Sequence, residues 1–306
     1  MIYFSDICKQ ITKKINSIDV KISHRLFSIF LLLFLLTPLK QVVSQNNIKE
    51  YIFIGHSAQS GSPNSIDYRA EALDFEKYTG VWLGGDVCTT TLLKKSTTHY
   101  LDSLFNLGNP ESHWTLGNHD WRIGNIEWYE EITGRPTYYA YSSNGLTRII
   151  MNTNLVPTNC EMLDEQYEMI SNVCDTITES SYLILIVHHG LWRGVPSIPA
   201  PINVGHSDLV YWNSNCYDVN STFLNSIYPK LIEVKARGIE VYYLYGDMGA
   251  QRKKFNVISD DSIHFIGCGL HSNDPADNVL IFTYDLDSKQ LQTDFHNLDS
   301  LYQLTK

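Results

Sequence analysis

The sequence lacks several features that define other classes of protein. It contains no run of basic residues that could follow a phosphate backbone, which argues against a nucleic-acid-binding function. It also contains no internal repeat and no low-complexity tract. No two cysteines have the Cys-x-x-Cys spacing that is typical of zinc and redox sites. Aromatic residues are plentiful at 12%, and charged residues make up a moderate 18%, so we expect a folded chain with a well-filled core.

Cysteines are few, and their number after the first 44 residues is odd. Cys8 lies near the start of the chain, and the other five are Cys88, Cys160, Cys174, Cys216 and Cys268. An odd number leaves at least one cysteine unpaired. Cys160 and Cys174 flank a stretch that we expect to be helical, and they are candidates for a disulfide in an oxidising compartment. The sequence cannot give the connectivity.

The apolar run near the N-terminus is too short to span a bilayer, which takes about 20 residues. Residues 27–36 are apolar except for Ser28, a basic segment precedes them, and Pro38 follows. Small residues at positions 42–44 suit a cleavage site. This pattern predicts a secretory signal peptide over residues 1–44, cleaved near Ser44, and a secreted or periplasmic protein. A retained membrane anchor is the alternative, and residues 45–306 suit a single domain.

The net charge of the chain is negative. Residues 1–44 carry six Lys or Arg and two Asp or Glu, so the rest of the chain has a formal charge of −14, against −10 for the whole. Such a surface does not attract anionic polymers or anionic membranes. We therefore expect no nucleic-acid polymer as a partner, and no membrane once the signal is removed. A phosphate-bearing substrate would need a locally positive site, which a bound metal ion can supply.

Helical and strand-like segments alternate in the first half of the chain, and hairpins follow in the middle and at the end. Residues 66–78 have helical spacing, and residues 137–151 are typical of a hairpin around an Asn-Gly turn. Residues 182–187 form a continuous apolar run, which is typical of a strand buried on both faces. This order predicts an α/β protein.

One long segment, residues 190–217, is rich in Pro, Gly, Asn and Ser and is predicted to be a loop over the strand ends. Long loops in compact domains are often functional. We expect Trp192, Arg193, Tyr211 and Trp212 to contribute to the rim of a pocket. Aromatic faces together with Arg suit a nucleotide base, a sugar or an aryl ester equally well.

Four apolar strand-like segments each end in Asp, Asn or His. They are residues 81–86 (Val-Trp-Leu-Gly-Gly-Asp), 116–120 (Leu-Gly-Asn-His-Asp), 183–189 (Leu-Ile-Leu-Ile-Val-His-His) and 241–247 (Val-Tyr-Tyr-Leu-Tyr-Gly-Asp). Open α/β sheets bind ligands at the carboxyl ends of their strands. Asp, Asn and His are ligands that hold divalent first-row metals. The pattern therefore predicts a metal site.

The order of these motifs resembles the calcineurin-like metallophosphoesterases over residues 52–285. The resemblance implies a four-layer αββα sandwich of two mixed β-sheets flanked by helices. It also implies a hydrolase that attacks phosphorus with a hydroxide made available near neutral pH by a divalent metal.

The resemblance assigns roles to individual residues. It implies that Asp86 bridges two metal ions and that Asn118 and His188 are ligands of one of them. It implies that His119 contacts the substrate phosphate and assists the leaving group. It also implies that Asp120 orients His119.

Two motifs depart from the family pattern. The family has Asp-x-His after the first strand, and here His56 can still bind a metal but Ala58 cannot. The family ends with Gly-His-x-His, and here Asp247 can replace the first His but Gly249 cannot replace the second. In the family, the residues of these two motifs that are lost here serve the same metal ion. We therefore expect one firmly held Mn, Fe or Zn ion, with ligands Asp86, Asn118, His188 and Asp247.

A second ion, beside His56, would need new ligands. His206 and His271 are the candidates, although a single His is more often an ordinary polar residue.

Two function classes remain open. The first is a secreted metal-dependent phosphoesterase acting on a small phosphate ester, and the retention of His119 beside Asn118 favours it. The second is a catalytically inactive metallophosphoesterase-like binding protein, favoured by Ala58 and Gly249. A structural domain without metal would leave the clustered strand-end residues unexplained. The sequence does not distinguish monoesters from diesters or give the oligomeric state.

Overall fold

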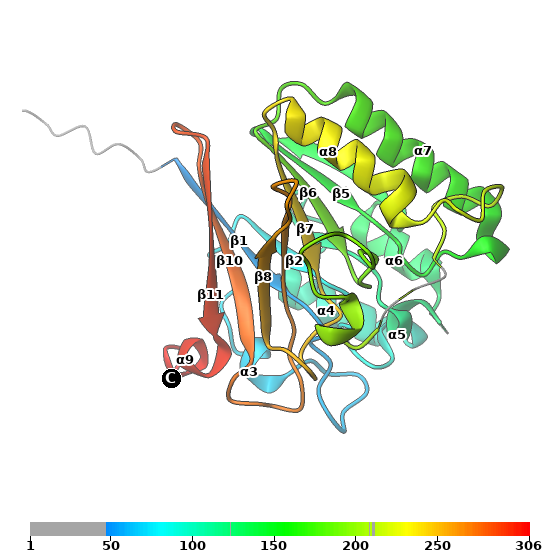
Figure 1. The fold of residues 1–306 in the computed structure, drawn as a ribbon. Coiled ribbons are helices and arrows are strands. Elements are labelled where there is room, and N and C mark those ends of the chain that lie inside the picture. Colours follow the sequence, from blue (N-terminus) through cyan, green and yellow to red (C-terminus); the bar gives the residue numbers. More distant parts are fainter. Residues whose placement is uncertain (1–46, 123, 208, 210–211) are drawn as a thin grey trace, which may run out of the picture. The chain divides into compact units, whose positions relative to one another are not determined.

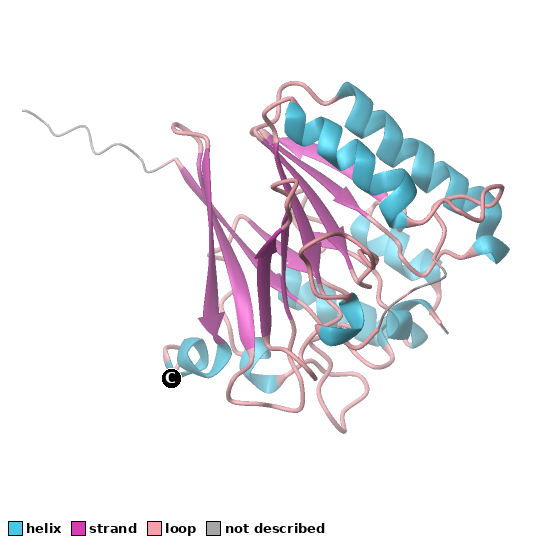
Figure 2. Cartoon of the chain, viewed as in Figure 1, coloured by secondary structure: helices cyan, strands magenta, loops and turns pink. Residues whose placement is uncertain are grey.

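Two β-sheets lie at the centre of the fold (Figures 1 and 2). The computed structural model describes residues 47–306 except residues 123, 208, 210 and 211. The predicted signal peptide, residues 1–44, lies outside the described residues. Asn47–Lys306 form one compact unit, which is the unit described below.

The first sheet has five strands in the described residues. In chain order they are β1 (Ile48–Ile54), β2 (Gly80–Leu83), β3 (His113–Trp114), β10 (Asn278–Asp285) and β11 (Gln290–Asn297). Their order in the sheet is β11-β10-β1-β2-β3. β1, β2 and β3 are parallel, whereas β10 and β11 are antiparallel to their neighbours, so the sheet is mixed.

The second sheet has six strands in the described residues. They are β4 (Tyr139–Ser143), β5 (Leu146–Ile150), β6 (Tyr182–Val187), β7 (Glu240–Tyr245), β8 (Lys254–Ile258) and β9 (His264–Cys268). Their order is β4-β5-β6-β7-β9-β8. The central four are parallel, and antiparallel β4 and β8 form the two edges.

Helices cover the outer faces of both sheets. The α-helices are α3 (Tyr68–Glu71), α4 (Lys95–Phe105), α5 (Asn118–Trp121), α6 (Ile126–Thr133), α7 (Cys160–Thr176), α8 (Tyr228–Ala236) and α9 (Leu298–Gln303). Shorter helical segments are η1 (Thr91–Leu93), η2 (Pro157–Asn159), η3 (Pro201–Asn203) and the π-helical η4 (Phe223–Ile227). Figure 1 shows α7 (green) and α8 (yellow) running alongside each other against the second sheet.

Alternating side chains of the strands produce the layers. In β1, Phe53 faces the other sheet while Ile54 packs with the helices that cover the first sheet. In β6, Ile184 faces the first sheet while Leu185 packs under α7 and α8. Both faces of these strands are therefore buried, as the continuous apolar run predicted. The architecture is the four-layer αββα sandwich of two mixed sheets flanked by helices.

The helical spacing over residues 66–78 was a wrong prediction for most of that segment. Only α3, which is four residues long, is helical, and Asp67 caps it by accepting a hydrogen bond from the backbone N–H of Arg69. The next segment must deliver Gly80 to its parallel partner Tyr51. It does so through turns that bury Phe75. The apolar residues of this segment are therefore buried, but they do not lie on a helix.

The predicted disulfide between Cys160 and Cys174 is also wrong. Both residues lie on α7, fourteen positions apart, and a helix separates such positions by about 21 Å. Cys160 instead pairs with Cys216, while Cys174 is buried and free. The disulfide fastens the long loop after β6 to the start of α7.

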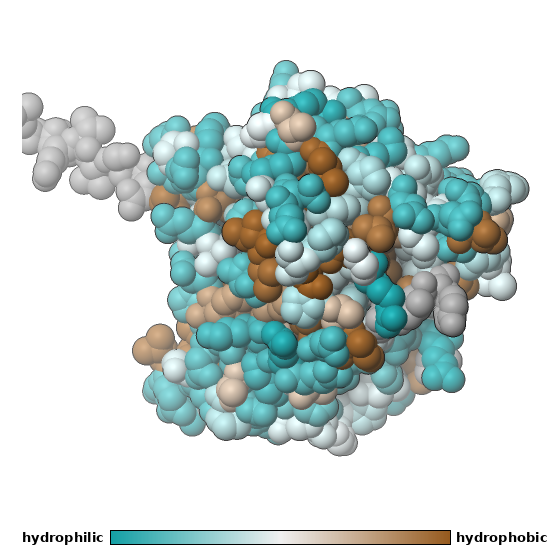
Figure 3. Space-filling view, viewed as in Figure 1, coloured by the Kyte–Doolittle hydropathy of each residue, from teal (hydrophilic) through white to brown (hydrophobic). Residues whose placement is uncertain are grey.

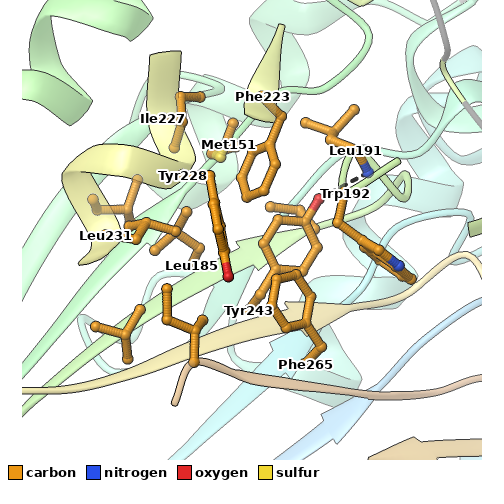
Figure 4. Close-up of a cluster of buried hydrophobic side chains, with 14 of the residues drawn as sticks. Met151, Leu185, Leu191, Trp192, Phe223, Ile227, Tyr228, Leu231, Tyr243 and Phe265 are labelled. Atoms are coloured by element: carbon orange, nitrogen blue, oxygen red, sulfur yellow. Dashed lines mark hydrogen bonds between the residues drawn. The ribbon is translucent and has the colours of Figure 1, made fainter. Parts of the chain in front are cut away.

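The segment at residues 190–217 is a loop as predicted, but its tryptophans do not line a pocket rim. Trp192 is 1% exposed and Trp212 is 4% exposed, and both belong to the core under α7 and α8. Figure 4 shows Trp192 beside Tyr243 and Phe265 in this core. Its indole N–H donates to the carbonyl of Pro199, 2.9 Å away. This hydrogen bond satisfies the polar atom of the buried side chain. Arg193 is exposed, and Tyr211 lies outside the described residues.

The surface seen in Figure 3 is mainly hydrophilic, with smaller apolar spots among the polar side chains. None of the helices in the described part of the chain has both the length and the apolar character needed to cross a membrane.

Candidate metal centre

The residues singled out in the sequence follow the carboxyl ends of strands, and the two sheets bring these ends together. His56 follows β1, Asp86 follows β2 and Asn118 follows β3, all in the first sheet. His188 follows β6 and Asp247 follows β7, both in the second sheet. Parallel strands place their carboxyl ends at one edge of a sheet, which is why loops distant in sequence can build one site.

His188 is held with one ring nitrogen pointing at two carboxylates. Its Nδ1 lies 2.7 Å from the carbonyl oxygen of Gly84, so Nδ1 carries the proton and donates. Its Nε2 lies 3.4 Å from Oδ2 of Asp86 and 3.9 Å from Oδ1 of Asp247. The side chain is buried, and no other described residue donates to or accepts from Nε2. This ring nitrogen therefore faces two negative groups.

The carboxylates of Asp86 and Asp247 favour a positive charge between them. Burial by itself lowers the pKa of His188, but Asp86 and Asp247 outweigh burial and raise that pKa to about 10. Burial raises the pKa of Asp86, and the His188 charge outweighs it and holds the pKa below its ordinary value. A proton on His188 or a cation between the three side chains satisfies the same requirement.

Asp86 lies at the middle of the centre. Its backbone has a φ of +50°, a left-handed conformation that costs a residue with a side chain about 1–3 kcal/mol. Its Oδ1 accepts the backbone N–H of His119 at 2.9 Å. Its Oδ2 lies between Nε2 of His188, at 3.4 Å, and Nε2 of His56, at 3.8 Å. The same carboxylate oxygen thus faces one imidazole from a loop of each sheet.

Asp247 is held in place by hydrogen bonds from the loop after β6. No sequence pattern predicted these contacts. Ser207 donates its hydroxyl to Oδ2 of Asp247, which leaves Oδ1 facing His188. The backbone N–H of His206 donates to the carbonyl of Asp247 at 3.1 Å. Ser207 therefore fixes the orientation of the Asp247 carboxylate, and no motif around Ser207 in the sequence indicates this contact.

Asn118 and His119 begin α5, and both side chains are exposed. The bond from the His119 backbone to Asp86 brings the start of α5 next to the centre. Asp120 is fully buried, and its Oδ2 accepts the backbone N–H groups of Asp86 at 2.8 Å and Gly117 at 2.9 Å. These bonds tie the loops after β2 and β3 together. Burial and the nearby Asp86 raise the pKa of Asp120 to about 6. The predicted orienting of His119 by Asp120 stays a prediction.

His189 is buried next to His188. Its Nδ1 is 2.7 Å from the hydroxyl of Thr153, and its ring packs edge-on against His188. Burial and the His188 charge lower the pKa of His189 to about 3. Its ring is therefore neutral and buried against His188.

Three further imidazoles meet on the other side of Asp86. His56, from the loop after β1, stacks on His206 with ring centroids 4.5 Å apart, and His271 lies 5.6 Å from His206. One ring nitrogen of each lies within 4.8 Å of the corresponding nitrogens of the other two. The sequence named His206 and His271 only as candidates, because they stand far from each other and from any motif.

Comparisons with known proteins give fold likenesses only. No family model matches the chain. No curated protein sequence matches it either. The chain is similar in fold to a dimetal phosphatase from Danio rerio, with 10% identity, a TM-score of 0.46, and coverage of 80% of this chain and 98% of that one.

Two nucleotidase structures are also similar in fold. A 5'-nucleotidase precursor from Thermus thermophilus has 8% identity and a TM-score of 0.41 over 84% of this chain, and an NAD nucleotidase from Haemophilus influenzae has 10% identity and a TM-score of 0.42 over 82%. The chain spans 58% and 50% of these two proteins.

Proposed function

We propose that this protein is a divergent calcineurin-like metallophosphoesterase that hydrolyses a small phosphate ester. The observation that carries the proposal is the position of Oδ2 of Asp86, between Nε2 of His188 at 3.4 Å and Nε2 of His56 at 3.8 Å. Asp247 closes the same group from the second sheet. Carboxylate and imidazole ligands suit Mn, Fe or Zn.

The residues present fit a divalent cation. His188 is fixed by the Gly84 carbonyl at Nδ1, so that Nε2 faces two carboxylates, and a hydrogen bond from the other ring nitrogen is the usual support of a metal-ligating His. His56 and Asp86 both adopt left-handed backbone conformations, and such strain concentrates at functional sites. When bound, a divalent ion supplies a Lewis acid and a nucleophile near neutral pH.

The side chains of this chain supply the remaining steps. Asp86, Asn118, His188 and Asp247 hold the ion in this proposal. The backbone N–H of His119 is bonded to Asp86, and its exposed ring can donate a proton to the leaving oxygen as the ester bond breaks. Because His119 is exposed, its ring is accessible to a substrate.

The test is hydrolysis of p-nitrophenyl phosphate and bis(p-nitrophenyl) phosphate by the purified protein after reconstitution with Mn, Fe or Zn. We expect turnover of one ester with at least one of these metals. His119→Asn should lower kcat by about 10²–10⁴-fold with unchanged metal content, because it removes a proton donor and no ligand. His99→Ala, an exposed substitution on α4, is the matched control and should keep full activity.

The same assay separates the enzyme from the alternative, a catalytically inactive binding protein. Bound metal without turnover of either ester, and with no difference between wild type and His119→Asn, would favour the binding protein.

We also propose that the protein works in an oxidising compartment, as a secreted or periplasmic protein. The support within the described residues is the Cys160–Cys216 disulfide, since such bonds persist outside the reducing cytosol. The mass of the protein recovered from its native host tests whether residues 1–44 are removed.

A further inference from the structure

We propose that His56, His206 and His271 hold a second divalent cation, which shares Asp86 with the first. This inference rests on the metal centre proposed above and extends it to a pair of ions with different ligands. Only His56 stands at a motif position of the resembling family, and there it replaces an Asp. His206 and His271 come from segments that carry no family motif.

The geometry suits a cation held by nitrogen. The three ring nitrogens lie within 4.8 Å of one another. A zinc-sized ion with bonds of about 2.1 Å in a tetrahedral arrangement would place its ligand atoms about 3.4 Å apart. Rotation of two side chains by small angles closes the difference, since His206 is exposed and His271 is half-buried.

The hydrogen bonds of the rings leave lone pairs where the ion would lie. Nδ1 of His56 lies 3.3 Å from the carbonyl of Leu270, so it donates and leaves the lone pair of Nε2 facing Asp86. Nε2 of His206 accepts a long bond of 3.3 Å from the backbone N–H of Ala250, so this nitrogen also presents a lone pair. Binding of a cation at Nε2 would replace that weak bond.

A buried ionic network holds His271 in place. Both carboxylate oxygens of Asp277 accept the backbone N–H of His271 at 3.2 Å. Asp277 is fully buried and is itself held by Arg69 at 2.8 Å and Lys253 at 2.9 Å. The segment that carries His271 is therefore anchored independently of any metal.

The two residues that abolish the family's ligands are explained by the same arrangement. Gly249 has a φ of +119°, and a methyl group there would lie 2.6 Å from the carbonyl oxygen of Leu270. The segment with His271 thus packs directly on the backbone at position 249, where the family has its last His. Ala58 pairs with Ile66 in an isolated bridge, and its lost ligand is replaced by His206 from the loop after β6.

The experiment measures metal per chain in the full-length protein after chelator treatment and titration with Zn²⁺ or Co²⁺. Elemental analysis should give two ions per chain for wild type and one for His206→Ala and for His271→Gln. His99→Ala should keep two. His188→Ala should keep one, and its Co²⁺ absorption spectrum should differ from that of His206→Ala, because different ligands remain. His206 is exposed, so its substitution leaves folding intact, which circular dichroism verifies.

Each outcome decides between the proposals. One ion in wild type, lost in His188→Ala and retained in both His206→Ala and His271→Gln, would overturn the second site and leave the phosphoesterase proposal standing. Two ions with the expected single losses, but no ester hydrolysis, would support the second site and overturn the phosphoesterase. No bound ion in wild type would overturn both.

Discussion

At the scale of single residues, positions without a side chain set how closely the loops of the metal centre approach. A methyl group at Gly117 would lie 2.0 Å from Oδ1 of Asp86 and 2.4 Å from its backbone nitrogen. Gly249 has the same function beside Leu270. The loops therefore pack too closely to accept a side chain at position 117. Glycine at this position allows Asp86 to stay close to the two imidazoles.

Gly117→Ala should therefore lower both stability and metal content. The added methyl must displace Asp86 or its backbone, and overpacking of this kind costs about 1–3 kcal/mol. Urea unfolding of the two proteins measures the loss, and elemental analysis measures the metal. Gly108→Ala is the control, because its methyl would meet only the carbonyl of Ile132 at 3.6 Å, an ordinary contact. Equal stability of the two variants would contradict the tight packing at Gly117.

At the scale of elements, the segment between β6 and η4 carries a proposed metal ligand although it has little regular secondary structure. Within its described residues, η3 is the only helix. The segment nevertheless brings His206 and Ser207 to the centre. The buried Trp192 anchors the loop near its start, and the Cys160–Cys216 disulfide anchors it near its end. A loop held at both ends can position a ligand because its entropy is lowered before the metal binds.

Cys216→Ser should lower the free energy of unfolding by about 2–4 kcal/mol, because the disulfide closes a loop of 56 residues in the unfolded chain. Urea unfolding under non-reducing conditions measures the change. Wild type treated with a reductant is the matched control and should unfold like the variant. An unchanged midpoint in both would show that the disulfide does not stabilise the fold.

At the scale of the whole described unit, the proposed ions connect the two sheets. His56, Asp86 and Asn118 follow strands of the first sheet, whereas His188 and Asp247 follow strands of the second. Without a cation, Asp86 and Asp247 depend on a protonated His188 to balance their charge. Metal binding therefore favours the folded state, in which both sheets are in place.

Removal of metal should lower the thermal stability of the protein. A ligand at 100 times its Kd stabilises the folded state by about 2.7 kcal/mol, so EDTA should lower Tm by several degrees. Scanning calorimetry with and without EDTA measures the shift, and re-addition of metal should restore Tm. The double variant His188→Ala/His56→Ala lacks a ligand on each side of Asp86 and should be insensitive to EDTA. A wild-type Tm that EDTA leaves unchanged would contradict metal binding in the folded state.

The sequence by itself predicted an α/β protein and the residues that follow its strands, and the family resemblance implied the four-layer sandwich. A six-residue apolar run identified β6. The apolar segments before Gly-Asp and Gly-Asn-His-Asp placed Asp86 and Asn118 at strand ends. These signals are local, because burial on both faces of a strand and turn chemistry are written within a few residues. β8 was missed since only Phe255 is buried among its five residues, which leaves no periodic pattern.

The tertiary structure alone decided which distant residues meet. Cys160 pairs with Cys216 because α7 carries Cys174 away, and Trp192 is buried because the loop folds back over the second sheet. His206 and His271 come from loops far apart in the sequence and meet His56 in the fold, where the backbone at Gly249 packs against Leu270. Hydrophobic periodicity reports which face of an element is buried, whereas the meeting of loops depends on packing between sheets, which no local pattern records.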